Sequence, residues 1–254
     1  MVSTASIPRD DVAVLWQERQ SAFLRAVSSK PSNYNYTVRT SRHAAFSKPA
    51  SEPARLLRKR LFDVVVASMA LLLLGPFLIL IAIAIKLSSP GPVLFSQPRY
   101  GYRNRRFSIY KFRTMYIHLS DRAGTRQCRS DDDPRVTPIG RLLRSASLDE
   151  LPQLLNVIKG NMSLVGPRPH VPGMLAANAL YEEVVPYYFQ RHALRPGMTG
   201  LAQVSGCRGS TAQANDAIER IDYDLEYIEK WSLWLDFKII LKTIWKEFLT
   251  GRGI

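Results

Sequence analysis

The most prominent hydrophobic pattern in the chain is a run of 22 residues, 64–85, that contains no charged side chain. At about 1.5 Å per helical residue, such a run can fill a hydrocarbon core of roughly 30 Å. Gly75 and Pro76 stand at its midpoint, where proline removes a backbone donor and crowds the preceding turn. Basic residues flank the run on both sides, and they favour the cytoplasmic face of a membrane. The pattern predicts a re-entrant helix–break–helix hairpin over residues 55–87, and a kinked helix that spans the membrane is the alternative.

Charged residues at the start of this hairpin have a helical spacing. Lys59 and Asp63 are four positions apart, so their charges can neutralise each other on one face. Together with Arg60 they are predicted to anchor the hairpin at the membrane interface.

The remainder of the chain shows the pattern of an α+β domain that is mainly helical. Short strands are predicted at residues 93–95 and 107–112, on either side of a basic turn. Residues 151–158 predict a short helix that ends near Gly160, with Ser147 or Asp149 as its N-cap.

A second amphipathic helix is predicted over residues 231–249. Its apolar positions are Trp234, Phe237, Leu241, Ile244, Trp245 and Phe248. A stripe of Lys238, Lys242 and Lys246 lies beside them, and tryptophan with lysine is typical of a helix that lies on a membrane surface. A helix packed on the domain core fits the same pattern.

Residues 1–54 differ from the rest because they are rich in polar residues and proline and show no apolar signal-peptide core. We expect them to form a mobile cytoplasmic tail. The expected organisation is therefore a tail (1–54), a membrane hairpin (55–87) and a cytosolic catalytic domain (88–254).

Charge narrows the possible partners. The chain has 254 residues and a formal net charge of +14, which favours an anionic partner such as nucleic acid, acidic lipid or a phosphorylated substrate. Residues 99–113 hold six basic side chains and no acidic one. The two cysteines and four scattered histidines give no spacing typical of a zinc site.

The candidate chemistry centres on Asp149 and Glu150, which lie at the predicted start of the short helix. The basic residues Arg144 and Arg168 are near them in sequence, and Lys111 and Arg113 come from the basic stretch before. An ionised aspartate among several cations suits nucleophilic attack on a phosphate, with Mg²⁺ as a fitting divalent ion. The sequence contains no P-loop, dinucleotide-binding, serine-hydrolase or zinc-protease motif.

From about residue 58 onward the chain resembles the bacterial sugar transferase family, the monotopic phosphoglycosyl transferases. The resemblance rests on seven motifs in one order: KRLFD (59–63), PGPV (90–93), YKFRTM (110–115), DPRVT (133–137), LDELPQ (148–153), VGPRP (165–169) and RPGMTG (195–200).

The resemblance implies transfer of a sugar 1-phosphate from a UDP-hexose, of glucose or galactose type, to undecaprenyl phosphate with release of UMP. This is the first step of exopolysaccharide, O-antigen or capsule synthesis on the cytoplasmic face of the bacterial inner membrane. It implies that Asp149, with Mg²⁺ and its partner Glu150, forms a covalent aspartyl-phosphosugar intermediate. An oligomer of identical chains is possible, and no nucleic acid is expected.

The resemblance also implies roles for the basic residues. Lys111, Arg144 and Arg168 match phosphate-holding positions, and Arg113 is grouped with them. Arg195, Gly197 and Thr199 are expected on the nucleotide side. The family breaks its membrane hairpin at Ser-Pro, whereas this chain has Gly75-Pro76. A basic membrane-surface or nucleic-acid-binding module without activity is the alternative, but it would explain neither Asp149-Glu150 nor the apolar run.

Overall fold

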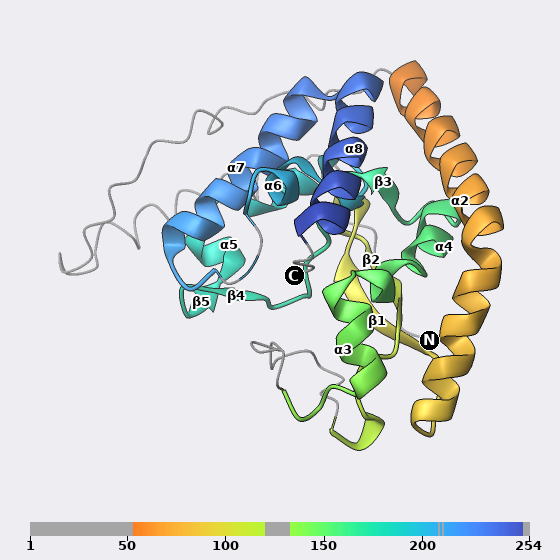
Figure 1. The fold of residues 1–254 in the computed structure, drawn as a ribbon. Coiled ribbons are helices and arrows are strands. Elements are labelled where there is room, and N and C mark those ends of the chain that lie inside the picture. Colours follow the sequence, from red (N-terminus) through yellow and green to blue (C-terminus); the bar gives the residue numbers. More distant parts are fainter. Residues whose placement is uncertain (1–52, 120–132, 208, 210, 251–254) are drawn as a thin grey trace, which may run out of the picture. The chain divides into compact units, whose positions relative to one another are not determined.

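The computed structural model describes residues 53–119, 133–207, 209 and 211–250 (Figure 1). The predicted N-terminal tail therefore lies outside the described residues, except for its last two positions.

The described part of the chain is mainly helical with short strands, which confirms the predicted fold class at this level. The helices are α2 (Pro53–Ser88), α3 (Pro138–Ser145), α4 (Gln153–Ile158), α5 (Tyr181–Val184), α6 (Leu201–Val204), α7 (Ala214–Lys230) and α8 (Leu233–Thr250). The 3₁₀ turns are η1 (Tyr102–Asn104), η2 (Ile117–Leu119), η3 (Leu148–Glu150) and η4 (Tyr188–Ala193). The strands are β1 (Leu94–Tyr100), β2 (Arg106–Phe112), β3 (Ser163–Val165), β4 (Leu175–Ala176), β5 (Ala179–Leu180) and β6 (Gly197–Thr199).

The strands form three two-stranded pairs. β1 and β2 make an antiparallel hairpin in which Leu94 pairs with Phe112 and Tyr100 with Arg106, so the two predicted strands and their basic turn are confirmed. β3 and β6 pair in parallel, and β4 pairs with β5 antiparallel.

Apolar side chains from distant segments form the main core. Fully buried members come from α4, α5, β3, α7 and α8, among them Val157, Val165, Tyr181, Ile221 and Ile239. A smaller cluster joins Ile81 and Ile85 of α2 to Phe112 and Leu143. Burial of large apolar side chains is the main favourable term in folding, at about 1.5–3 kcal/mol each.

Helix α2 is one uninterrupted helix of 36 residues that continues through Gly75 and Pro76 (Figure 1). The interruption that the sequence predicts at Gly75-Pro76 is therefore not seen. Residues 56–88 are long and apolar enough to cross a membrane, yet only 11% of their most apolar window is buried. A helix in the core of a soluble domain would be mostly buried, so this helix leaves an apolar surface for another environment.

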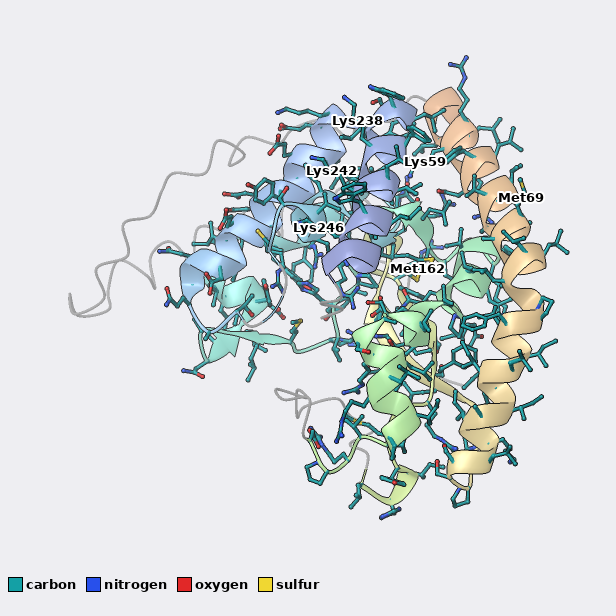
Figure 2. All side chains as sticks on the ribbon, viewed as in Figure 1. Lys59, Met69, Met162, Lys238, Lys242 and Lys246 are labelled. Atoms are coloured by element: carbon teal, nitrogen blue, oxygen red, sulfur yellow. The ribbon has the colours of Figure 1, made fainter. Side chains whose placement is uncertain are left out.

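The N-terminal part of α2 is fixed to the rest of the domain by a buried polar network. Lys59 Nζ donates to Asp236 Oδ2 of α8 at 2.7 Å, and Asp236 also accepts from Tyr227 Oη at 2.7 Å and Trp231 Nε1 at 3.1 Å. Asp63 accepts from Ser163 Oγ at 2.8 Å. Figure 2 shows Lys59 between α2 and α8.

These contacts correct the predicted interface anchor. Lys59 and Asp63 are only 5% and 2% exposed, and Arg60 donates to the carbonyls of Val157 and Ile158 at the end of α4. Lys59, Arg60 and Asp63 therefore bind α2 to the domain. Their helical spacing was correctly identified, because Lys59 and Asp63 lie 3.8 Å apart.

Arg113 fixes the other end of α2. Its guanidinium donates to the carbonyls of Ile85 at 3.2 Å, Ser89 at 2.7 Å and Pro90 at 2.8 Å. Ile85 lies in the last turn of α2, where helix carbonyls lack an intrahelical partner, and Ser89 and Pro90 follow the end of the helix. The buried arginine therefore binds the end of α2 and the turn after it. Arg113 is thus an anchor for α2 and does not join the predicted phosphate-binding group.

Helix α8 confirms the predicted C-terminal amphipathic helix. Its exposed apolar side chains are Trp234, Phe237, Leu241, Ile244 and Trp245. Lys238 and Lys242 are exposed beside them, whereas Lys246 donates to the Val204 carbonyl at 2.7 Å. Figure 2 labels the three lysines along α8.

The Lys59–Asp236 contact predicts a large loss of stability when only one partner is removed. Lys59→Met leaves the fully buried Asp236 carboxylate without its cation, and breaking a buried pair in this way typically costs about 3–5 kcal/mol. Thermal unfolding in detergent should show a correspondingly lower midpoint. The control is Lys230→Met, which removes an exposed ion pair with Glu226 on α7 and should leave the midpoint unchanged.

Candidate active site

Four separate segments bring together the charged residues that surround Asp149. Lys111 comes from β2, Arg144 from α3, and Arg168 from the loop after β3. Asp149 and Glu150 lie on η3, a single 3₁₀ turn that precedes α4. The predicted helix start is therefore displaced: Ser147 adopts a left-handed conformation (φ 52°) and makes no capping hydrogen bond with its side chain.

Glu150 is the centre of the ionic contacts. Its Oε1 accepts from Lys111 Nζ at 2.6 Å and from Arg168 Nη2 at 2.5 Å, and its Oε2 accepts from Arg168 Nη1 at 3.1 Å. Arg168 thus binds Glu150 with both terminal nitrogens, which fixes the plane of the guanidinium. Lys111 Nζ also lies 3.7 Å from Asp149 Oδ2.

Asp149 keeps one carboxylate oxygen unpaired. Its side chain is buried, and within the described residues its Oδ1 accepts no hydrogen bond. A buried acceptor without a donor costs free energy, and such atoms are concentrated at functional sites. This oxygen is available to a reacting group or a cation.

The two neighbouring carboxyl groups have opposite pKa shifts. Burial raises the pKa of Asp149, and the nearby Glu150 charge adds to this, although Lys111, Arg144 and Arg168 act in the other direction. Burial would raise the pKa of Glu150 as well, but the charges and hydrogen bonds of Arg168 and Lys111 hold it far below its usual range. Glu150 is therefore ionised and paired, whereas burial disfavours the charged form of Asp149. Carboxyl groups whose environments separate their pKa values are typical of catalytic pairs.

Arg144 is directed towards this group by local structure. Its Nε donates to Thr114 Oγ1 at 2.9 Å. Thr137 caps α3 by accepting from the N–H of Gly140 at 2.9 Å. A Cβ at Gly140 would come within 2.1 Å of the Thr114 carbonyl oxygen, so only glycine allows α3 to approach this closely. Thr114 was not predicted as a site residue, although it lies in the same motif as Lys111.

The residues predicted on the nucleotide side make their contacts elsewhere. Arg195 Nε donates to the Gly160 carbonyl at 2.9 Å, and Thr199 Oγ1 lies 2.6 Å from Thr243 Oγ1 of α8. A Cβ at Gly197 would meet the backbone N of Gly166 at 2.1 Å, which explains the glycine at this strand crossing. The motif packs β6 against β3, and through β3 it fixes the start of the loop that carries Arg168.

The donor set fits a hard divalent cation only in part. No group of three His, Cys, Asp or Glu side chains is close enough to hold a metal among the residues that the structure describes. The unpaired Asp149 oxygen provides one ligand, and Mg²⁺ commonly binds one or two carboxylates and takes its other ligands from substrate phosphates and water. The chain therefore fits a cation that arrives with a phosphorylated substrate.

The opposite pKa shifts predict opposite effects on stability. Asp149→Asn removes a charge that folding disfavours, so it should raise the midpoint of thermal unfolding by roughly 2–4 °C, equivalent to about 1 kcal/mol. Glu150→Gln removes a charge that two cations stabilise, so it should lower the midpoint. Scanning calorimetry near pH 7 measures both, and a lower midpoint for Asp149→Asn would contradict the assigned electrostatics.

Comparison with known proteins agrees with this site. Residues 54–250 match the family described as bacterial sugar transferase. The chain is 52% identical over 198 residues to an undecaprenyl-phosphate glucose phosphotransferase of Komagataeibacter xylinus. The matched region covers 78% of this chain and 37% of that protein. It is 51% identical to the exopolysaccharide production protein PSS of Rhizobium leguminosarum bv. phaseoli, covering 78% of this chain and 98% of that protein.

A third relative is a UDP-glucose:undecaprenyl-phosphate glucose-1-phosphate transferase of Escherichia coli (strain K12), 46% identical over 80% of this chain and 43% of that protein. The chain thus spans less than half of two of these relatives and nearly all of the third. The match includes every segment that contributes to the charged group around Asp149. The chain belongs to the bacterial sugar transferase family.

Proposed function

We propose that this chain transfers a sugar 1-phosphate from a UDP-hexose to undecaprenyl phosphate and releases UMP, the first step in building an exopolysaccharide, O-antigen or capsule. The observation that carries the proposal is the buried Asp149 carboxylate, with one unpaired oxygen, beside Lys111 and the Glu150–Arg168 pair. Two relatives whose names state an undecaprenyl-phosphate substrate support the choice of acceptor, and both names specify glucose.

The reaction proceeds in two displacements at one phosphorus. The Asp149 carboxylate attacks the phosphorus that bears the hexose, and the bond from that phosphorus to the bridging oxygen breaks as UMP leaves. A phosphate oxygen of undecaprenyl phosphate then attacks the same phosphorus and releases the carboxylate. Lys111 and Arg168, already oriented by Glu150, neutralise the phosphoryl oxygens, and Arg144 adds a third positive charge.

Mg²⁺ fits this scheme as the ion that accompanies the pyrophosphate of the donor. Asp149 would hold it, and when bound it would neutralise charge on the phosphoryl oxygens. Lys111 and Arg168, which are held in place by Glu150, orient the substrate.

The membrane arrangement follows from how α2 is held. Its buried positions, Lys59, Asp63 and Ala67 near one end and Ile81 and Ile85 near the other, are each spaced by four residues. Residues 68–80 between them include no buried side chain. Between these ends, one face of α2 still packs on the domain through the partly buried Ala70, Leu71 and Leu78. The opposite apolar face is available to lipid; Met69, for example, is 65% exposed and points away from α8 (Figure 2).

A helix with both ends docked on one domain cannot place those ends on opposite sides of a membrane while the docking persists. We therefore propose a monotopic protein on the cytoplasmic face of the inner membrane, in which residues 55–87 enter and leave the same leaflet. Pro76 lacks the donor for the Leu72 carbonyl, and we propose that the helix, which is continuous in this structure, bends there in lipid. The exposed Trp234, Trp245, Lys238 and Lys242 of α8 have the composition of a helix at a membrane surface.

Activity is expected to require Asp149. Purified chain, UDP-glucose, Mg²⁺ and undecaprenyl phosphate should yield UMP and a lipid-linked sugar, with a panel of UDP-sugars defining the donor. Asp149→Asn should lower the rate at least 10³-fold because the amide is not a nucleophile. Lys230→Met is the control and should keep full activity. Retention of the wild-type rate by the Asp149 variant would rule out the mechanism.

The same-side topology is tested by labelling. In a chain with Cys128 and Cys207 replaced by serine, single cysteines at Arg58 and Arg103 should react with a membrane-impermeant maleimide only from the cytoplasmic side. Inside-out and right-side-out vesicles distinguish the two sides. Labelling of the two positions from opposite sides would show a complete span.

A further inference from the structure

The short segment that carries Arg168 is held through its main-chain carbonyls. Pro167 and Pro169 have no N–H, so this stretch cannot form a regular backbone ladder. Four consecutive carbonyls nevertheless accept hydrogen bonds, each from a different residue. The donor–acceptor pairs are Gly197 N to Pro167 (3.0 Å), Arg191 Nη2 to Arg168 (2.7 Å), Arg99 Nη1 to Pro169 (3.3 Å) and Tyr100 N to His170 (3.0 Å).

Arg191 is the most unusual of these donors because its charge is buried. The residue is 1% exposed, and its Nη2 lies 2.6 Å from Asp224 Oδ2 of α7. Its guanidinium also lies over the ring of Tyr188 at 5.6 Å. Burying an ion pair is at best weakly stabilising, since desolvation offsets the attraction. Stability alone therefore does not explain a buried arginine at this position.

The position of Arg191 relative to Arg168 suggests the explanation. The Arg191 guanidinium binds the main chain of Arg168, and the Arg168 side chain binds Glu150 with both terminal nitrogens. The same nitrogen, Nη2, contacts both the Asp224 carboxylate and the Arg168 carbonyl. Its two N–H bonds have fixed directions in the guanidinium plane, whereas the ammonium of lysine rotates freely. Asp224 balances the charge, so Arg191 can be held in a buried position beside the loop.

We propose that Arg191, with its charge balanced by Asp224, is a positioning residue for Arg168. It fixes the Arg168 main chain so that the side chain reaches Glu150 and the substrate phosphate together. The part that concerns the phosphate rests on the proposed function, whereas the part that concerns the loop does not.

Kinetics test the coupling between the two arginines. Arg191→Lys should lower kcat/KM for the UDP-sugar by roughly 10- to 100-fold, because small displacements of a positioning group have effects of this size. In an Arg168→Lys background the same change should have less than about 3-fold effect, because the group that it positions has already been altered. The matched control is Lys230→Gln on α7, which should show the wild-type kcat/KM in both backgrounds.

A second variant guards against loss of folding. Arg191→Gln combined with Asp224→Asn removes both charges and leaves neither one buried alone. It should reproduce the loss in kcat/KM while its thermal midpoint stays closer to that of the wild type than the midpoint of Asp224→Asn alone. The kinetic test has a contradicting outcome as well. If the separate losses in kcat/KM of Arg191→Lys and Arg168→Lys multiply when the two substitutions are combined, the proposal is overturned.

Hydrogen exchange gives a readout that does not depend on activity. In Arg191→Lys, the amides of residues 163–175 should exchange faster than in the wild type. Those of α8, residues 233–250, should be unchanged because no hydrogen bond or ion pair joins α8 to Arg191 in the described structure. Equal exchange across residues 163–175 would contradict the positioning role. A failure of the proposed function would instead appear as no UMP release by the wild type, with the difference in exchange still present.

Discussion

The bridge that the Glu150 carboxylate makes between Lys111 and Arg168 determines how the rest of the site is arranged. It connects β2, η3 and the loop after β3 through contacts of 2.5–3.1 Å. Because Glu150 takes both cations, the adjacent Asp149 stays buried with one oxygen unpaired. Two neighbouring carboxylates thus acquire different properties from their partners alone. Glu150 organises the cations, and Asp149 is the proposed nucleophile.

A second set of buried polar contacts positions this site relative to the apolar helix. Lys59 and Asp63 bind one end of α2 to α8 and β3, and Arg113 binds the other end through three carbonyls. Lys111, which contacts Glu150, lies only two residues before Arg113 on the same chain segment. The distance between the charged group and the exposed apolar surface of α2 is therefore set by short covalent connections. The proposed transfer from a soluble nucleotide sugar to a lipid acceptor requires such a fixed distance.

Much of this arrangement could be predicted from the sequence, because its signals are local. The uncharged run, the alternating strands of the hairpin and the adjacent Asp149 and Glu150 are each visible within a few residues. Proximity in sequence also grouped Arg144 and Arg168 with that pair, and Lys111 was added from the basic stretch of residues 99–113. The sequence predicts residues of the RPGMTG motif on the nucleotide side. The β3–β6 pairing gives a different reason for the glycine of this motif, because the two strands cross closely there.

The errors have equally physical causes. Arg113 shares a face with Lys111 only while the strand continues, but β2 ends at Phe112, and the next side chain turns towards α2. Lys59 and Asp63 have the spacing of a helix pair in any surroundings, so the pattern could not distinguish lipid headgroups from a buried carboxylate of α8. The Arg191–Asp224 contact joins residues 33 positions apart and leaves no local signal.

The covalent intermediate gives the most direct test of the central claim, that Asp149 is the nucleophile. The chain would be incubated with UDP-glucose and Mg²⁺ without any polyprenyl phosphate, digested under acidic conditions and analysed by peptide mass spectrometry. The account predicts release of up to one UMP per chain and a hexose phosphate on the peptide that contains Asp149. Release of UMP only when the lipid acceptor is present, with an unmodified Asp149 peptide, would contradict it.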